Sequence, residues 1–306
     1  DNRADYCRRV DSDAGTGRLA CTLFTGTAFG RTVTSAQLAV GQDVGWAWDD
    51  ANGDNKADYC RRLDPAGGTG RVACTLSTGT GFGSTITSGH LDLGRDAGWE
   101  WEDVNGDDNS DYCRRLSGTG STGRIACTLS TGTGFGSTIT SGDLDLGRDA
   151  GSEWEDVNGD DKSDYCRRLS GTGSTGRIAC TLSTGTGFGS TITSGDLNVG
   201  RDAGVAWEDV NGDERADYCR VIGGRDDRLA CTPSTGIGFG VTVTSRAVDR
   251  GRGAGVRWVD LNSDERKDFC RRVGGDGGER LACTLTTGTG FGRTVRSAVL
   301  DWGFDD

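Results

Sequence analysis

One unit of about 53 residues recurs along the whole chain, and this repetition restricts the fold more than any other feature of the sequence. Each copy contains the step Asp-(Tyr/Phe)-Cys-Arg and, further on, the step Ala-Cys-Thr. The first step contains Cys7, Cys60, Cys113, Cys166, Cys219 and Cys270, and the second contains Cys21, Cys74, Cys127, Cys180, Cys231 and Cys283. Six tandem copies predict an array of equivalent modules.

Within one copy, taken here as residues 54–106, short stretches of strand-forming residues alternate with turn residues. Residues 57–63 and 71–77 are separated by Pro-Ala-Gly-Gly-Thr-Gly, which predicts a hairpin. Residues 85–87 are β-branched, and residues 98–101 lead into an acidic loop. Four strands per copy predict an all-β fold, a six-bladed β-propeller of four-stranded antiparallel blades. A parallel β-helix needs shorter rungs, and a helical solenoid needs a 3.6-residue period that is absent.

The two ends of the sequence match the two sides of one acidic loop. Residues 304–306 (Phe-Asp-Asp) correspond to Trp48-Asp49-Asp50, and residues 1–7 correspond to residues 54–60. We therefore expect one blade to be shared between the termini, which closes residues 1–306 into a single propeller domain.

The composition excludes several partners. The 306 residues include 53 glycines and carry a formal charge of −12, which disfavours nucleic acid and acidic membranes. No apolar run reaches the length of a membrane span, and no signal-peptide pattern opens the chain, so we expect a mature, soluble product with no membrane insertion.

The cysteines predict disulfides rather than zinc. Twelve cysteines at regular spacing, with a single histidine, are typical of a disulfide framework in a secreted, extracellular protein. Zinc needs four converging ligands, usually in two close pairs, and that spacing is absent. Because the two cysteines of a copy face each other across its hairpin, we predict the pairs 7–21, 60–74, 113–127, 166–180, 219–231 and 270–283, although sequence alone does not fix connectivity.

Five loops have the form Asp-x-Asn-x-Asp-x-x-x-Asp, with oxygen donors at positions one, three, five and nine. They are Asp50/Asn52/Asp54/Asp58, Asp103/Asn105/Asp107/Asp111, Asp156/Asn158/Asp160/Asp164, Asp209/Asn211/Asp213/Asp217 and Asp260/Asn262/Asp264/Asp268. Such donors suit calcium better than magnesium, and clustered carboxylates repel one another without a cation. The alternative is a set of Asx turns that only cap backbone amides. We predict about five Ca²⁺ sites; occupancy of the sixth loop, split between Asp306 and Asp1, stays open.

Two short motifs recur in the chain. The first is Asp-Val-Asn-Gly-Asp, as at 103–107, and the second is Thr-Gly-Thr-Gly-Phe-Gly, at 78–83, 131–136, 184–189 and 287–292. With these motifs the chain resembles the FG-GAP, or VCBS-type, repeats of integrin α-chain propellers and of secreted fungal and bacterial propeller lectins. The resemblance covers essentially the whole chain and implies a propeller with calcium in these loops. The family usually has glycine at loop position six and more often has seven blades, and its pattern lacks the cysteine pair. Glu214 and Glu265 stand at that position here, so their loops are expected to bind calcium more weakly.

Almost every candidate site residue is repeated in the other copies, whereas an enzyme active site needs a set of catalytic residues that occurs once. The only histidine, His90, aligns with Asp143 and Asp196 and therefore looks exposed and variable. The obvious carboxylate clusters already belong to the acidic loops. We predict from this that the chain is not an enzyme.

Tryptophans and arginines form columns across the copies. The column Trp48, Trp101, Trp154, Trp207, Trp258 and Phe304 is expected in the core. Two residues earlier, Trp46, Trp99 and Trp302 are replaced elsewhere by Ser152, Val205 and Val256. A sugar could stack there with Arg95 or Glu100 binding its hydroxyls, and packing between blades is the alternative.

Arginines form two columns, one directly after the first cysteine of each copy and one three residues before the second. The columns are Arg8, Arg61, Arg114, Arg167, Arg220 and Arg271, then Arg18, Arg71, Arg124, Arg177, Arg228 and Arg280. We expect both to pair with acidic side chains on solvated strand faces, or else to bind carboxylated or sulfated glycans.

Taken together, these features predict a secreted, multivalent carbohydrate-binding module, lectin-like in function, whose partners are glycans on a cell surface or polymer. The alternative is an adhesion, protein-interaction or structural subunit of a larger secreted assembly, with another secreted protein as its partner.

Overall fold

The computed structural model describes residues 5–13, 15–64, 68–116, 122–148, 151–169, 175–201, 204–223, 227–251, 256–274 and 278–299. The chain divides into two compact units. Unit 1 comprises Asp1–Leu146 and Ser183–Phe188, and unit 2 comprises Gly147–Leu182 and Gly189–Asp306. The prediction of one domain over residues 1–306 stays a prediction.

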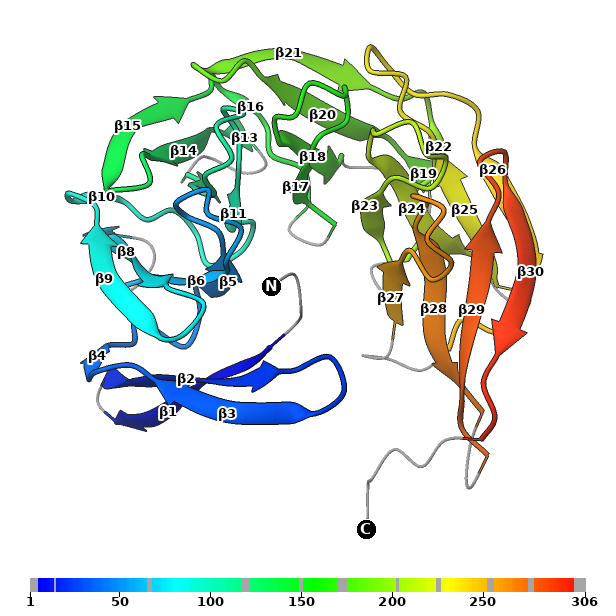
Figure 1. Ribbon diagram of the computed structural model, residues 1–306. Coiled ribbons are helices and arrows are strands. Elements are labelled where there is room, and N and C mark those ends of the chain that lie inside the picture. Colours follow the sequence, from blue (N-terminus) through cyan, green and yellow to red (C-terminus); the bar gives the residue numbers. More distant parts are fainter. Residues whose placement is uncertain are drawn as a thin grey trace. The chain divides into compact units, whose positions relative to one another are not determined.

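Unit 1 contains three four-stranded antiparallel sheets in its described part (Figure 1). Sheet 1 consists of β1 (Tyr6–Asp13), β2 (Thr16–Phe24), β3 (Phe29–Thr34) and β4 (Leu38–Ala39), with β4 paired to β2. Sheet 2 has the order β5 (Trp46–Asp49), β6 (Asp58–Arg62), β8 (Val72–Ser77), β9 (Phe82–Thr87). Sheet 3 repeats this order with β11 (Glu100–Glu102), β12 (Asp111–Arg115), β14 (Ile125–Ser130) and β15 (Phe135–Thr140). Two short ladders join β7 (Thr69–Gly70) to β10 (Leu91–Asp92) and β13 (Thr122–Gly123) to β16 (Leu144–Asp145).

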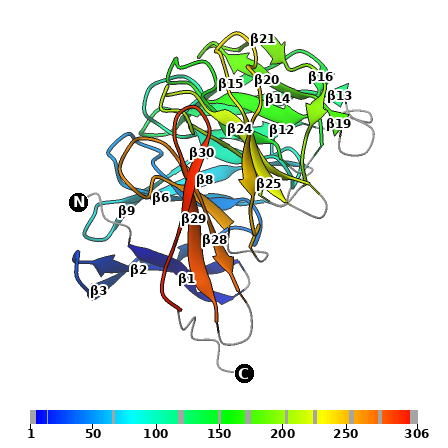
Figure 2. The same cartoon turned by 90° about the vertical axis from the view of Figure 1, so that its right-hand side faces the viewer.

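Unit 2 repeats the same sheet three times where it is described, and Figure 2 shows strands of the last sheet in orange and red. Sheet 4 has the order β17 (Glu153–Glu155), β18 (Asp164–Arg168), β20 (Ile178–Ser183), β21 (Phe188–Thr193), and β19 (Thr175–Gly176) pairs with β22 (Leu197–Asn198). Sheet 5 consists of β23 (Ala206–Glu208), β24 (Asp217–Ile222), β25 (Arg228–Thr232) and β26 (Val243–Ala247). Sheet 6 consists of β27 (Val256–Val259), β28 (Asp268–Val273), β29 (Arg280–Thr286) and β30 (Phe291–Arg296).

The all-β class and the repeated four-stranded antiparallel sheets confirm the coarse fold prediction, while closure into a propeller stays a prediction. Among the described residues, no helix is long and apolar enough to cross a membrane.

All six disulfides join the predicted partners, and no cysteine is free. In sheet 2, Cys60 lies directly opposite Cys74 in the β6–β8 register, with Cα atoms 4.0 Å apart. The hairpin therefore brings the two thiols together, as the residue spacing predicts. In the chain-entropy model, a loop of this length stabilises the fold by about 3 kcal/mol.

The core of each unit lies between successive sheets. In unit 1, the Cys60–Cys74 disulfide, Ala51 and Ile86 pack against Trp101 of sheet 3. The Trp101 ring lies 5.1 Å from that of Tyr112 in a tilted arrangement. Trp101, Trp154, Trp207 and Trp258 are all buried, which confirms the core prediction for these four residues. Trp48 is only half-buried, and Phe304 lies outside the described residues.

Candidate functional site

Each acidic loop curls around its first aspartate. In the loop after β11, one Asp103 carboxylate oxygen accepts hydrogen bonds from the backbone N–H groups of Asn105 (3.0 Å) and Gly106 (2.7 Å). Its other oxygen accepts from the N–H of Asp108 at 2.7 Å. These are the hydrogen bonds of the Asx-turn alternative, so the loops form their turns through their own amides.

Position six of every loop has a left-handed backbone, where the resembling family usually has glycine. The φ angles are 60° at Asn55, 64° at Asp108, 60° at Asp161, 62° at Glu214 and 65° at Glu265. Asn and Asp tolerate this region better than Glu, so the two glutamates place the most strain in the loops after β23 and β27.

The aspartate at position nine is buried in all five loops and ties the loop to a neighbouring strand. One Asp58 oxygen accepts from the Ala51 N–H at 3.1 Å, and the other accepts from the Ser77 N–H at 2.7 Å. Burial raises the pKa of Asp58 to about 7 and that of Asp111 to about 8, with smaller contributions from the neighbouring loop carboxylates. A bound cation would offset this cost.

The calcium prediction requires the side-chain oxygen of the asparagine at position three to face the ion, and several of these side chains are oriented differently. Three of them donate from the amide nitrogen to a carboxylate of their own loop: Asn105 to Asp107 at 3.1 Å, Asn211 to Asp217 at 3.1 Å, and Asn262 to Asp264 at 2.9 Å. An amide nitrogen is a hydrogen-bond donor and does not ligate a cation. Coordination of calcium in these loops would therefore require the amide group to turn its oxygen toward the ion.

The asparagine oxygen of the loop after β17 is occupied as well. Asn158 Oδ1 accepts from the Asp160 N–H at 3.0 Å, and the Asn158 N–H donates to the Asp156 carboxylate at 3.0 Å. The Asn52 N–H likewise donates to Asp50, at 3.2 Å. The position-three residues thus act in the turns of their own loops, as the Asx-turn alternative predicts.

The carboxylates at position five are likewise engaged by neighbouring groups. In four loops they pair with a basic residue at position seven: Lys56 with Asp54, Lys162 with Asp160, Arg215 with Asp213, and Arg266 with Asp264. The loop after β11 has Asn109 at position seven, and its N–H donates to the exposed Asp107 carboxylate at 3.0 Å.

The loops fit calcium in donor type, but their carboxylates do not converge. Within the described ranges, no three acidic, histidine or cysteine side chains lie close enough to hold a metal ion. The predicted Ca²⁺ sites at all five loops stay predictions, and the split loop of Asp306 and Asp1 lies outside the described residues.

Successive loops within a unit are joined by main-chain hydrogen bonds. In unit 1, the Ser110 N–H donates to the Asp50 carbonyl at 2.7 Å. In unit 2, the Ala216 N–H donates to the Asp156 carbonyl at 2.7 Å and the Lys267 N–H to the Asp209 carbonyl at 2.8 Å. Neighbouring loops of one unit therefore form a continuous edge rich in carboxylates.

Five of the six arginines of the first column are buried, and Arg8 is half-buried, which corrects the prediction that this column lies on solvated strand faces. Arg61 Nε donates to the Ala39 carbonyl at 2.6 Å, and its Nη1 donates to the Thr75 hydroxyl at 2.9 Å. Its guanidinium also lies 5.2 Å from the centre of the Tyr59 ring. The same burial holds for Arg114, Arg167, Arg220 and Arg271. Backbone carbonyls and aromatic faces satisfy these cations, so they are not available to a glycan.

The second arginine column is exposed in every copy: Arg18, Arg71, Arg124, Arg177, Arg228 and Arg280. Arg71 lies 3.9 Å from Asp64, and both side chains remain well exposed. These arginines fit the solvated faces that the sequence predicts.

Trp46 and Trp99 lie in contact with arginines of the preceding sheet. The Arg9 guanidinium is 5.1 Å from the Trp46 ring centre, and that of Arg62 is 5.4 Å from Trp99. Arg62 also donates to the Arg95 carbonyl at 2.7 Å, so it contacts both Arg95 and Trp99.

These contacts follow the packing alternative, and the sequence pattern did not single out Arg62. Glu100 is half-buried in β11, His90 is exposed, and Trp302 lies outside the described residues. The assignment of these residues to a ligand stays a prediction.

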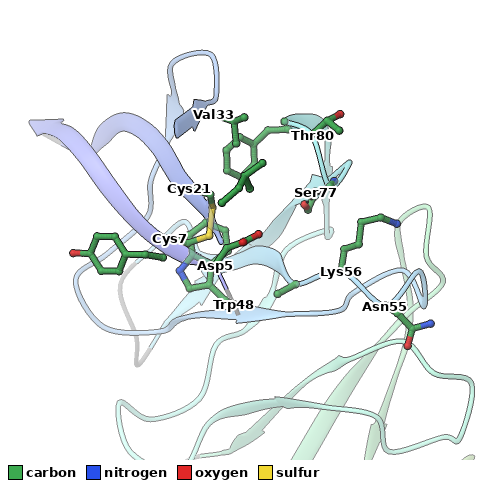
Figure 3. Close-up of a pocket in the computed structure, with 15 residues that line it drawn as sticks. Asp5, Cys7, Cys21, Val33, Trp48, Asn55, Lys56, Ser77 and Thr80 are labelled. Carbon is green, nitrogen blue, oxygen red and sulfur yellow. Dashed lines mark hydrogen bonds between the residues drawn. A yellow bond between two sulfur atoms is a disulfide. The ribbon is translucent and has the colours of Figure 1, made fainter. Parts of the chain in front are cut away.

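A cavity of about 810 Å³ opens in unit 1 between sheets 1 and 2 (Figure 3). Its walls include the Cys7–Cys21 disulfide, Val33, Trp48 and Asp5. Lys56, Ser77 and Thr80 complete the opposite side. The repeat pattern did not predict this cavity, because every copy has residues at the sequence positions that line it here.

No family model matches the chain. A stretch of 125 residues is 32% identical to the NAD(+)–arginine ADP-ribosyltransferase Chelt of Vibrio cholerae. This stretch makes up 40% of the present chain and 20% of the relative, so the match spans about a fifth of the length of that protein.

The similarity to an ADP-ribosyltransferase contradicts the prediction that the chain is not an enzyme. That prediction rested on the repetition of the candidate residues, which left no set of catalytic residues that occurs once. The repeat by itself does not indicate the kind of protein in which such a segment occurs.

Proposed function

We propose that the chain is a secreted β-propeller recognition module of the FG-GAP or VCBS repeat type, which binds calcium in its acidic loops and carbohydrate on its exposed strand faces. The repeated four-stranded antiparallel sheets and six disulfides support this proposal.

The exposed second arginine column carries the carbohydrate proposal. It places one guanidinium at the same surface position of every copy, on a frame held by disulfides. A guanidinium binds carboxylate and sulfate groups through paired hydrogen bonds, so acidic glycans are the favoured ligands. Several weak equivalent sites would gain avidity on a polymer.

The test compares glycan arrays of sulfated, carboxylated and neutral glycans, each with calcium and with chelator. We expect binding to acidic glycans, reduced at least tenfold in a double variant Arg124→Gln, Arg177→Gln by loss of two charge-assisted contacts. Arg293→Gln is the matched control, because Arg293 is also exposed but lies outside the column. Equal loss in the control would reject a specific role for the column.

A second candidate function is ADP-ribosyl transfer from NAD⁺ to arginine, favoured by the similarity to Chelt. Incubation of the chain with NAD⁺ and a small arginine analogue, followed by mass spectrometry, tests this directly. A product carrying one added ADP-ribose would support the activity. Its absence, with an active control enzyme in the same assay, would count against it.

A third candidate is the binding of another secreted protein. Ile237 and Val241 are 89% and 86% exposed, at positions where other copies have polar Thr80 and Ser84. Exposed apolar side chains that interrupt a polar pattern favour a protein contact. Loss of a co-purifying chain from an Ile237→Thr, Val241→Ser variant would support this function.

A further inference from the structure

The cavity between sheets 1 and 2 is the open counterpart of an interface that is filled between sheets 2 and 3 of the same unit. In the filled interface, Ala51 of the first acidic loop is fully buried against the Cys60–Cys74 disulfide and Trp101. The equivalent groups around the cavity are the Cys7–Cys21 disulfide and Trp48. The filled interface therefore shows which kind of group suits the open one.

Three hydrogen-bonding groups hold the turn at residues 50–53 in the filled interface. The Asp58 carboxylate accepts from the Ala51 N–H at 3.1 Å, and the Ser130 hydroxyl donates to the Ala51 carbonyl at 2.6 Å. The Ser110 N–H donates to the Asp50 carbonyl at 2.7 Å. The turn is thus recognised through its main chain, by one acceptor and two donors.

The same three groups line the cavity, and the equivalent bonds are not made by any described residue. Asp5 corresponds to Asp58; its Oδ1 accepts from the Phe24 N–H at 2.7 Å, and its Oδ2 accepts from no described residue. Ser77 corresponds to Ser130; it accepts from Gly79 at 3.2 Å, but within the described ranges its hydroxyl donates to no carbonyl. The Ala57 N–H, equivalent to that of Ser110, also lacks an acceptor in this part of the chain.

The remaining walls match the rest of the turn. In the filled interface, a Cβ added to Gly132 would lie 3.5 Å from the Asn52 carbonyl, which is ordinary van der Waals contact, so the turn lies directly beside this glycine. Gly79 takes the equivalent place in the cavity. Figure 3 shows Asp5 and the Cys7–Cys21 disulfide facing the wall that carries Ser77.

We propose that this cavity binds a peptide turn of the form Asp-(small apolar)-Asn-Gly presented by another polypeptide chain. Asp5, Ser77 and Ala57 bind the main chain of the turn. Its small apolar side chain enters the slot between the Cys7–Cys21 disulfide, Val33 and Trp48. This interaction is separate from glycan binding by the exposed arginine column.

The test uses the intact oxidised chain and a fluorescent hexapeptide, Glu-Asp-Val-Asn-Gly-Asp, with both ends blocked, measured by anisotropy. Asp5→Asn keeps the acceptor for Phe24 but replaces the free oxygen by a donor, and Ser77→Ala removes the hydroxyl. Each should weaken peptide binding about 5- to 10-fold, as expected for one lost hydrogen bond. Ser84→Ala is the matched control, because Ser84 is an exposed serine of the same copy outside the cavity.

A control peptide with glutamate in place of valine should bind at least tenfold more weakly, because the slot would bury its charge. Unfolding is monitored in each variant, and Val33→Arg, which fills the slot, serves if Ser77→Ala fails to fold. Self-association that the free peptide reverses, and that Asp5→Asn abolishes, would also support the site, with a second copy as the partner. No peptide binding to the parent chain, or equal binding by Asp5→Asn and the parent, would overturn the proposal.

Discussion

Two interfaces in unit 1 are built from equivalent residues, yet one is filled and the other is open. Between sheets 2 and 3, Ala51 occupies the space beside Trp101, and Trp101 is 2% exposed. Between sheets 1 and 2, a cavity lies beside Trp48, which is half-buried. The difference shows that the aromatic column alone does not seal an interface. The turn that precedes the buried aspartate completes the packing.

The largest expected effect concerns the two tryptophans. Trp101→Ala should destabilise unit 1 by about 3–5 kcal/mol, because it removes a fully packed side chain. Trp48→Ala should cost only about 1–2 kcal/mol, since part of its ring already faces the cavity. Chemical denaturation of the oxidised variants measures both values. Equal losses would show that Trp48 is as well packed as Trp101 and would break the comparison.

Calcium should stabilise the filled interface through its acidic loops. At a calcium concentration a hundredfold above its dissociation constant, we expect about 2.7 kcal/mol of added stability, because the ion neutralises carboxylates gathered in the folded state. Chelation should lower the Tm correspondingly, and elemental analysis should find the metal.

The loops themselves provide the control for the calcium prediction. Lys56→Asn removes the ammonium 3.0 Å from Asp54 and copies the Asn109 arrangement, so it should strengthen calcium binding in a calorimetric titration. An unchanged Tm on chelation, with no metal detected, would leave the loops as Asx turns alone.

The corresponding interface of unit 2 carries an additional carboxylate and should respond to pH. The Glu153 carboxylate accepts a hydrogen bond from the backbone N–H of Trp207 at 2.9 Å. In the corresponding interface of unit 1, Ala47 stands at the position of Glu153. Burial, and to a lesser degree Glu208, raise the pKa of Glu153 to about 7 from 4.5. The protonated form therefore favours folding. This contribution is fully present below about pH 4.5 and is lost as the pH rises through 7.

Glu153→Gln should consequently stabilise the protein at pH 8 by roughly 1–3 kcal/mol and change little at pH 4. Urea denaturation at the two pH values checks this. A stabilisation that is the same at both would exclude titration of Glu153 as its cause.

The smallest effect concerns the equivalent serines. Ser130→Ala removes a buried hydrogen bond to the Ala51 carbonyl and should cost about 1–2 kcal/mol. Ser77→Ala should cost under about 1 kcal/mol, because its hydroxyl donates to no described carbonyl. Paired thermal melts measure the difference. If Ser77→Ala were the more destabilising, the cavity would have to be filled in solution.

Residue spacing predicted the local geometry well. The Cys60 and Cys74 positions flank a short turn, so antiparallel pairing places them opposite each other, as the β6–β8 register shows. The left-handed backbone at Asn55 likewise follows from its place in a tight loop. In both cases the partners lie close together in the sequence.

The surroundings of Arg61 and Arg62 could not be predicted in the same way. Spacing placed both on a strand, but the carbonyl of Ala39 that binds Arg61 and the Trp99 ring that covers Arg62 come from other segments. An arginine that looks solvated in a charged sequence is buried when such partners replace water.

The sequence by itself therefore predicted the number of copies, the four-stranded sheets and the six cysteine pairs. The hairpins that hold the cysteine pairs depend on contacts within one copy, whereas each sheet also takes a strand from the preceding copy, as β5 does beside β6. The tertiary structure alone decided which arginines are buried and which are exposed, and which interface is left open beside Trp48. Those outcomes depend on how one copy packs against the next, where a single turn such as residues 50–53 either fills the space between sheets or leaves it open.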